Sequence, residues 1–341
     1  MGSTPRNISG SRAASILGHS PFATPLQTFQ QIMEDLHPGW NDAHGYTLPE
    51  HTDTAATRFG LAFESAIVEL SERETGLKIG DREKLFEMEI KGLGPITSCH
   101  VDGIFSDDSV YEAKTTSSFM FRESWGTPGT DRIPEYYQVQ LQHNLMLSGK
   151  EEAKLFLLCF PETPEAWEKM GWEILDSLNK DGSRSYFLVH EDMDIHVRPQ
   201  LWADTLYMMG FFHTYRILAK PDVQQSMVER YRDFWTRYVI PGIPPEPQNY
   251  ADIQRLFVKP VGTIVCDEEL TRWWSEYDLI GKEIGKSGQG AKRREVLKMD
   301  ILGKARKIDA VVDEESCEKI IFRSADGKKL GQYSRNSGFR S

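Results

Sequence analysis

Apolar residues recur every three or four positions between residues 54 and 75, where Phe59, Phe63 and Ile67 fall on one face of a helix. From residue 84 to residue 116 the pattern changes to the alternation of apolar and polar side chains that is typical of strands. The chain therefore predicts a long amphipathic helix followed by a group of β-strands.

Two of these strands form a predicted hairpin. They cover residues 96–105 and 110–116, and a short run of Ser and Asp between them favours a tight turn. Pro134 then begins a helix that ends near Gly149, and residues 153–160 read as an apolar strand. This mixture of helices and strands favours an α/β fold.

The C-terminal half contains more helical patterns and one clear boundary. Proline and glycine crowd the sequence from Pro241 to Pro247, which predicts a domain of residues 1–245 and an extension of residues 246–341. The remaining predicted elements are amphipathic helices at residues 198–219 and 223–238, a charged helix at residues 268–301 and a β-hairpin within residues 308–322.

The composition is that of an ordinary globular protein, because 39% of the 341 residues are hydrophobic and 27% are charged. No run of about 18 apolar residues occurs, so a transmembrane helix is not predicted. The four cysteines are scattered without a C-x-x-C pair, which argues against a zinc knuckle or an iron–sulfur cluster. Reduced thiols in a cytoplasm are the simplest interpretation.

The net charge of −11 does not by itself indicate a nucleic-acid partner, but the charge is unevenly distributed. Residues 281–341 hold 15 Lys and Arg against 9 Asp and Glu. A protein that is acidic overall can still bind DNA through one basic face. The basic region 282–307 therefore has three interpretations: contact with a duplex backbone, packing on a neighbouring subunit, or ordinary solvent-exposed surface.

The predicted hairpin brings three charged residues together. Glu112 and Lys114 alternate on one strand and so face the same side. The turn sets Asp102 roughly opposite Ala113 on the neighbouring strand. Two carboxylates and one ammonium then converge, which suits oxygen coordination of a hard divalent cation and the orientation of water toward a phosphodiester. The alternative is a surface salt bridge between Glu112 and Lys114.

Two helices carry further polar candidates. Tyr137, Gln140 and Asn144 share one face of the later helix, and the alternative for that face is simple exposure to solvent. Glu64 interrupts the apolar pattern of the helix at residues 54–75, and we interpret it as functional.

In these features the sequence resembles the PD-(D/E)xK nucleases, and within them the YqaJ-like viral recombinase family that includes phage lambda exonuclease. The resemblance lies in four ordered motifs within residues 8–160, although the proline that usually precedes the first Asp is absent. The motifs are Ile8-Ser9-Gly10-Ser11 with Gly18-His19-Ser20-Pro21, Arg58-Phe59-Gly60 with Glu64, Val101-Asp102-Gly103 with Glu112-Ala113-Lys114, and Tyr137-Gln138-Val139-Gln140-Leu141-Gln142 with Gly149.

The resemblance implies a restriction-endonuclease-like core, with a central mixed sheet flanked by helices and a C-terminal helical and hairpin extension. It also implies two Mg²⁺ ions, for which Mn²⁺ can substitute. Asp102 would contact both ions, Glu112 and the carbonyl of Ala113 would hold one, and Glu64 would support the other. Lys114 would position the attacking water and help to deprotonate it. Gln140 would orient the same water or the scissile phosphate.

The N-terminal motif resembles the family's pocket for a terminal 5′-phosphate. Backbone N–H groups at a helix start favour anions, and Ser11 has a hydroxyl to donate. Arg6 and Arg12 are both candidates for the arginine of this pocket, and Tyr137 is a further DNA-binding candidate. The alternative is a simple helix N-cap at Ser9 or Ser11.

Residues 117–133 follow the catalytic strand without periodicity, which predicts a loop. Phe119, Phe121, Arg122 and Trp125 in this segment are residue types that stack on bases, so we expect the loop to contact a DNA end.

The family resemblance implies a 5′→3′ exonuclease that resects double-stranded DNA ends for phage-type single-strand annealing recombination. It further implies a ring-shaped homotrimer, a single-strand annealing protein as partner, and the cytoplasm of a bacterial host as location. Two alternatives remain. One is a structure-specific or restriction-like endonuclease, and the other is a non-catalytic DNA-binding protein with a decayed nuclease fold.

Overall fold

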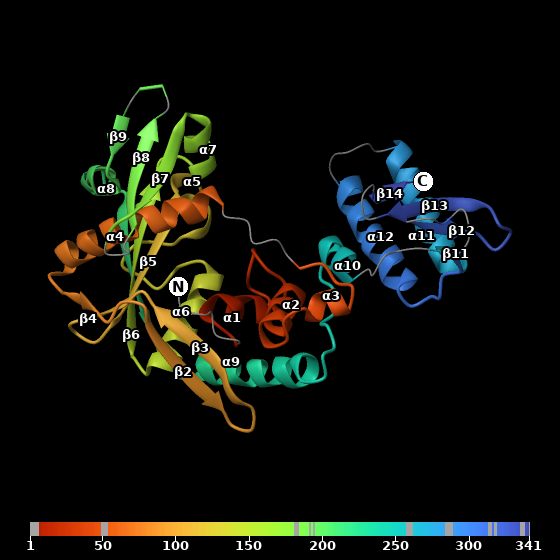
Figure 1. Cartoon of the computed structure of the whole chain (residues 1–341), viewed down its shortest axis with the longest axis horizontal. Helices are drawn as coiled ribbons and strands as arrows, with labels where there is room; N and C mark the ends of the chain where they lie inside the picture. The colour runs from red at the N-terminus through yellow and green to blue at the C-terminus, as the bar shows by residue number, and fades with distance from the viewer. Residues whose placement is uncertain are drawn as a thin grey trace. The chain divides into compact units, whose positions relative to one another are not determined.

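The chain forms two compact units, which are Met1–Phe22 with Glu50–Thr236 and Ala23–Pro49 with Arg237–Ser341. The predicted division after residue 245 stays a prediction, whereas packing separates the chain after Thr236 and groups residues 23–49 with the C-terminal unit. The computed structural model (Figure 1) describes residues 7–48, 54–180, 184–190, 192–193, 195–256, 262–283, 289–312, 316, 319–334 and 338–340.

A mixed β-sheet forms the centre of the first unit. Its strands lie in the order β1-β4-β5-β6-β10 within the described residues. The pair β5–β6 is parallel and the other neighbours are antiparallel, which confirms the predicted α/β class with a mixed central sheet. The strands are β1 (Ile79–Gly80), β4 (Gly103–Phe105), β5 (Val110–Ser117), β6 (Glu152–Phe160) and β10 (Phe212–Leu218).

The two faces of this sheet are covered by different helices. Side chains alternate along β6, so one half of them packs with α4 (Ala55–Thr75) and the other half with α6 (Glu135–Ser148). The apolar face predicted for residues 54–75 is thus buried on the sheet. On the α4 side β6 contributes Phe156, Leu158 and Phe160, and on the α6 side it contributes Leu155, Leu157 and Cys159.

The predicted strand of residues 96–105 is divided at Asp102. Its first part is β3 (Gly94–Val101), which pairs with β2 (Lys84–Ile90) in a separate two-stranded sheet. Its second part, β4, pairs with β5, so the hairpin that was predicted around residues 106–109 is confirmed. At the point of division, Oδ2 of Asp102 accepts the backbone N–H of Ala113 at 2.9 Å.

Two other sequence predictions for this unit are wrong. Residues 117–133 are not entirely loop, because Ser117 caps the short helix α5 (Ser118–Ser124). Residues 198–219 do not form one helix, because α8 (Pro199–Met208) ends before Gly210 and the following residues pair with β6 as strand β10. A short segment with many aromatic residues is compatible with a helix or a strand. Here residues 212–218 are a strand because they pair with β6.

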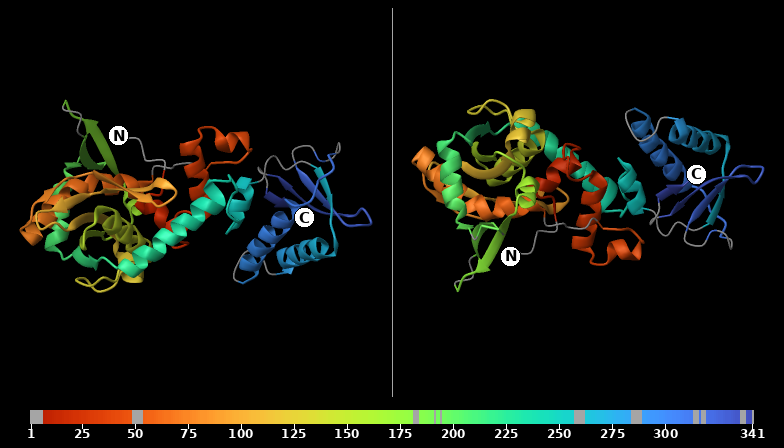
Figure 2. Two further views of the ribbon diagram at one scale, coloured as in Figure 1. Left: turned by 90° about the horizontal axis from the view of Figure 1, so that it is seen from below. Right: turned by 90° about the horizontal axis from the view of Figure 1, so that it is seen from above.

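The remaining elements of the first unit pack around the sheet. Helix α1 (Gly10–Ile16) and the long helix α9 (Pro221–Phe234) both pack on α6, and the teal ribbon of α9 is visible in Figures 1 and 2. A π-helical turn, Trp235–Val239, follows α9 and contains the point at which the chain passes from the first unit to the second. The other elements are α7 (Pro164–Lys169) and the small sheet of β7 (Trp172–Leu178), β8 (Arg184–His190) and β9 (Ile195–Val197).

The second unit has its own core around the buried Trp274. The charged helix predicted at residues 268–301 is two helices in the structure, and the terminal hairpin lies later than predicted. Among the described helices, none is both long and apolar enough to cross a membrane. The elements are α2 (Pro25–Leu36), α3 (Trp40–Ala43), α10 (Tyr250–Leu256), β11 (Gly262–Val265), α11 (Glu268–Glu283), α12 (Gln289–Ala305), β12 (Ile320–Arg323), β13 (Lys329–Ser334) and β14 (Gly338–Arg340).

Gly10 lets α1 approach α6 closely, and a side chain there would not fit. A Cβ at this position would lie 2.9 Å from Oδ1 of Asn144 and 3.1 Å from Cγ of Gln140. Both side chains are held by hydrogen bonds to Glu112, so they cannot move away freely. We therefore expect Gly10→Ala to lower the free energy of unfolding by about 1–3 kcal/mol, measured by urea denaturation.

Gly60→Ala is the matched control for this substitution. Gly60 lies inside α4, where an added Cβ meets only Oγ1 of Thr115 at 3.9 Å, an ordinary contact. Ala is the better helix former by about 0.5–1 kcal/mol, so the control should be neutral or slightly more stable. Equal stability of the two variants would show that the approach of α1 to α6 does not depend on Gly10.

Candidate active site

The alternation of β5 turns two charged side chains toward α6. Val110 belongs to the apolar cluster on the α6 side of the sheet and Tyr111 to the cluster on the α4 side. Glu112 and Lys114 therefore face α6, as the sequence predicted for a shared face. Their side chains form an ion pair, with Glu112 only 1% exposed and Lys114 19% exposed. The site is thus a buried pair, and the alternative of a surface salt bridge does not hold.

Asp102 joins this pair from the bend between β3 and β4. Its Oδ2 accepts the backbone N–H of Ala113, the residue between Glu112 and Lys114, at 2.9 Å. The carboxylate is therefore fixed at the edge of β5, and its negative charge acts on both members of the pair. The predicted convergence of two carboxylates and one ammonium is present in the structure.

Helix α6 supplies two amides that hold the buried carboxylate. Nε2 of Gln140 donates to Oε1 of Glu112 at 2.9 Å, and Nδ2 of Asn144 donates to Oε2 at 3.4 Å. The ring of Tyr137, on the same helix face, lies 5.3 Å from Nζ of Lys114. The polar face of α6 is therefore directed at Glu112 and Lys114 and not at solvent.

Burial dominates the protonation of this cluster. Burial first, and the charge of Asp102 second, raise the pKa of Glu112 from its ordinary 4.5 to about 7, although Lys114 opposes the change. For Lys114, burial disfavours the charged form, but Glu112 and Asp102 outweigh it and raise the pKa above its usual range. The ammonium therefore stays protonated, while Glu112 is the group that exchanges its proton near neutrality.

Glu64 lies within electrostatic reach of Asp102 but has a partner of its own. Arg82, in the turn after β1, forms an ion pair with the Glu64 carboxylate. Burial raises the pKa of Glu64, Arg82 opposes this, and Asp102 adds to it. Sequence reasoning missed Arg82, because no motif contains it and only the path of the turn brings it to α4.

The chemistry of these groups fits a divalent cation. Among the described residues, no three His, Cys, Asp or Glu side chains lie close enough together to hold one ion by themselves. Mg²⁺, however, typically takes one or two carboxylates and completes its shell with water and substrate phosphate. Asp102 and Glu112 provide such a pair, and the negative charge of Asp102 helps to raise the pKa of Glu112, an effect that a bound cation would offset. Oδ1 of Asn144 is buried without a hydrogen-bond partner in the described chain, so this oxygen could accept a hydrogen bond from a bound water or ligand.

The N-terminal candidates lie on α1, next to α6. Ser9 is the N-cap, since its Oγ accepts the N–H of Arg12 at 3.4 Å, and it also contacts Oγ of Ser11 at 3.2 Å. Nη1 of Arg12 donates to the carbonyl of Asn7 at 2.9 Å. Arg6 lies outside the described residues, so the structure does not choose between the two arginines.

The aromatic residues after β5 have different surroundings. Phe121 stacks on His213 with ring centroids 4.4 Å apart, and Trp125 packs between the rings of Tyr137 and Tyr215. Phe119, in contrast, is 59% exposed. Two of the predicted DNA contacts therefore have a clear packing role, whereas Phe119 and Arg122 are both exposed.

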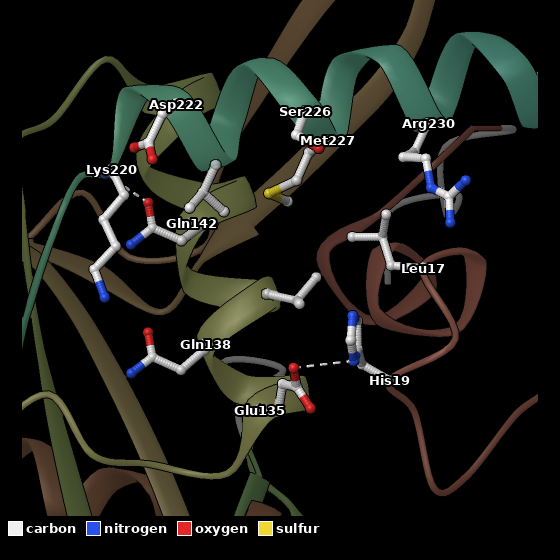
Figure 3. A pocket seen from close by; sticks show the side chains of 12 residues that line it. Leu17, His19, Glu135, Gln138, Gln142, Lys220, Asp222, Ser226, Met227 and Arg230 are labelled. Carbon is white, nitrogen blue, oxygen red and sulfur yellow. Dashed lines mark hydrogen bonds and ion pairs between the residues drawn. The ribbon is translucent and has the colours of Figure 1, made fainter.

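A surface cavity of about 570 Å³ lies on the opposite face of α6 (Figure 3). Gln138 and Gln142 point toward it, and helical geometry puts them across the helix from Gln140 and Asn144. At one end of the cavity His19 pairs with Glu135 at 3.1 Å, which ties the turn after α1 to the start of α6. This cavity is separate from the cluster around Glu112.

Comparison with known proteins gives a partial sequence similarity to one protein family and a distant structural likeness. The protein YqaJ of Bacillus subtilis (strain 168), which is uncharacterized, is 27% identical over 152 residues, or 44% of this chain and 42% of that protein. The chain thus matches less than half the length of this relative.

Two solved structures are similar to the chain at low scores. The alkaline exonuclease LHK-Exo from Laribacter hongkongensis has 12% identity and a TM-score of 0.42, covering 68% of this chain and 87% of that one. A phage related exonuclease from Haemophilus somnus 129PT has 13% identity and a TM-score of 0.40, covering 69% and 96%. Likeness at this level assigns no activity.

The sequence model of the YqaJ-like viral recombinase domain matches residues 4–151. This segment contains α1, the whole of β5 with its buried ion pair, and α6. The matched segment therefore includes Glu112 and the α6 side chains that hydrogen-bond to it, whereas β6, which pairs with β5 beside Glu112, lies outside it. Within residues 4–151, which are less than half of the chain, the sequence is similar to the YqaJ-like viral recombinase domain.

Proposed function

We propose that the chain is a metal-dependent deoxyribonuclease that degrades double-stranded DNA from its 5′ ends. The observation that carries this proposal is the Glu112 carboxylate, which is buried beside Asp102 and Lys114 and held by amides of α6. A protein gains little stability from burying such a cluster, since the desolvation of charges costs several kcal/mol. A chemical role accounts for it, and metal-assisted phosphodiester hydrolysis suits these groups.

Asp102 and Glu112, with the carbonyl of Ala113, are the residues that would hold Mg²⁺ or Mn²⁺. Glu64 would support a second ion after its release from Arg82. When bound, the metal supplies positive charge at the scissile phosphate and lowers the pKa of the attacking water. Gln140 and Asn144 keep Glu112 in place, so the donor oxygens are organised in advance.

Lys114 is the group that would position the water. Its ammonium is a hydrogen-bond donor because its pKa is raised, and a positive charge at that place favours the hydroxide form of a neighbouring water. The water oxygen attacks phosphorus and the bond from phosphorus to the 3′ oxygen breaks. The products are a 5′-mononucleotide and a shortened strand that again carries a 5′-phosphate.

The similarity of residues 4–151 to the YqaJ-like viral recombinase domain supports the biological part of the proposal. Resection from 5′ ends would leave 3′ single strands for a phage-type annealing protein in a bacterial cytoplasm. Ser11 and Arg12 at the start of α1 would bind the terminal 5′-phosphate. A homotrimeric ring belongs to the same proposal, since a ring keeps an enzyme on its duplex.

Lys114→Ala is expected to reduce the release of nucleotides from linear duplex DNA in Mg²⁺ by about 10²–10⁴-fold. The reason is the loss of the only ammonium that pairs with Glu112 in the described chain. Lys154→Ala is the matched control, because Lys154 is also 19% exposed and paired with a carboxylate, that of Asp107. Comparable activity of the two variants would remove Lys114 from the mechanism.

An end-dependent exonuclease should leave closed circles intact. We expect digestion of a 5′-phosphorylated linear duplex, slower digestion of the same duplex with a 5′-hydroxyl, and none of a covalently closed circle. For each of the three substrates, the release of acid-soluble nucleotides measures digestion, and gel electrophoresis measures the DNA that remains. Cleavage of the circle would favour an endonuclease, and a complete lack of product with Mg²⁺ or Mn²⁺ would favour a DNA-binding protein without catalysis.

Glu112 makes the proposed site sensitive to pH. Metal binding needs its ionised form, and its pKa is raised to about 7, so the affinity for Mn²⁺ should increase as the pH rises from 6 to 8. The metal-free folded protein holds this proton more tightly than the unfolded chain does. Its free energy of unfolding should therefore decrease as the pH rises from about 4.5 to about 7.

Glu112→Gln is the control for both effects, because a glutamine does not titrate. Titration calorimetry with Mn²⁺ and thermal unfolding without metal measure them separately. An unfolding profile that depends on pH in the same way for the variant and the native chain would place the proton elsewhere.

A further inference from the structure

Three aromatic rings lead from the candidate active site to the surface. The ring of Tyr137 lies 5.3 Å from Nζ of Lys114, and the ring of Tyr136 lies 4.2 Å from that of Tyr137. Phe22 meets Tyr136 edge-on, with ring centroids 5.3 Å apart. We call Phe22, Tyr136 and Tyr137 the aromatic row.

The outer end of the aromatic row is unusually exposed for a phenyl ring. Phe22 is 76% exposed, although it lies in a turn that several contacts fix. Its N–H donates to Oγ of Ser20 at 3.2 Å, and His19 in the same turn pairs with Glu135 (Figure 3). The ring is therefore presented to solvent by an ordered turn and contributes little to the core.

The chemistry of the row fits the bases of a single strand of DNA. Aromatic side chains stack on unpaired bases of any sequence, because every base offers a flat π-face, whereas bases within a duplex are already stacked. The inner end of the row lies at Lys114, where the proposed reaction acts on a phosphate. A strand that has its phosphate at Lys114 would bring its unpaired bases alongside Tyr136 and Phe22.

We infer that Phe22 and Tyr136 form a stacking platform for unpaired bases of the DNA strand that enters the site. The inference rests on the proposed function for the identity of this strand. The platform would let the site take a frayed end without reading its sequence. It would also add affinity that does not depend on salt, beside the contacts to phosphates.

The test is binding of a fluorescent oligothymidine by anisotropy, without divalent metal, so that no strand is cut. Phe22→Ala and Phe22→Leu should each weaken binding by about fivefold or more, because one base loses its stacking partner. Phe22→Trp should bind at least as well as the native chain. Tyr136→Phe keeps the ring and should bind normally, whereas Tyr136→Leu should be weakened.

Two controls separate stacking from other effects. An abasic oligomer of the same length has the phosphates without the bases, and all Phe22 variants should bind it equally. Met208→Ala removes an equally exposed side chain, 77% exposed on α8, and should leave oligothymidine binding unchanged.

The outcomes also separate this inference from the proposed function. Normal binding by Phe22→Leu, an equal loss on the abasic oligomer, or no binding of oligothymidine by the native chain would each overturn the platform, even if duplex DNA is digested. A loss that depends on the ring would support the platform, even if the chain releases no nucleotides.

Discussion

The buried carboxylate of Glu112 is the constraint on which the rest of the first unit depends. A carboxylate that is 1% exposed is tolerated only if charged and polar groups surround it, because unpaired burial costs several kcal/mol. Lys114 forms an ion pair with it from the same strand, and Gln140 and Asn144 donate hydrogen bonds to it from α6. The carboxylate therefore fixes the position of α6 over the sheet, and Gly10 allows α1 to close against the same two amides.

The same constraint determines the protonation of the candidate site. Hydrogen bonds favour the ionised form of Glu112, but burial and the nearby charge of Asp102 oppose it more strongly, so the pKa is raised to about 7. A group in this condition can take a proton or a cation at similar cost. The two carboxylates keep the ammonium of Lys114 protonated, so it can donate a hydrogen bond to a water or a phosphate in the site. The arrangement of the site and its proposed chemistry thus both depend on the burial of Glu112 beside Asp102 and Lys114.

Local patterns were sufficient to predict the centre of the site, and tertiary contacts were needed for its surroundings. Strand alternation placed Glu112 and Lys114 on one face, and helical spacing placed Gln140 and Asn144 on another; the structure brings these faces together. The pairing of Arg82 with Glu64 joins residues 18 positions apart through a turn that has no sequence signature. Likewise, the strand β10 was read as helix, because its pairing with β6 depends on a segment more than fifty residues earlier.

The first turn of α6 determines how the aromatic row is arranged. Successive residues of α6 point about 100° apart, so Tyr136 and Tyr137 cannot both face Glu112 and Lys114. Tyr137 does so, while Tyr136 is turned toward the N-terminal turn and meets Phe22 there. The first turn of α6 therefore connects the buried charges to an exposed ring through two adjacent side chains. The contact of His19 with Glu135 also joins this N-terminal turn to the first turn of α6, so the turn that carries Phe22 meets α6 at two neighbouring side chains.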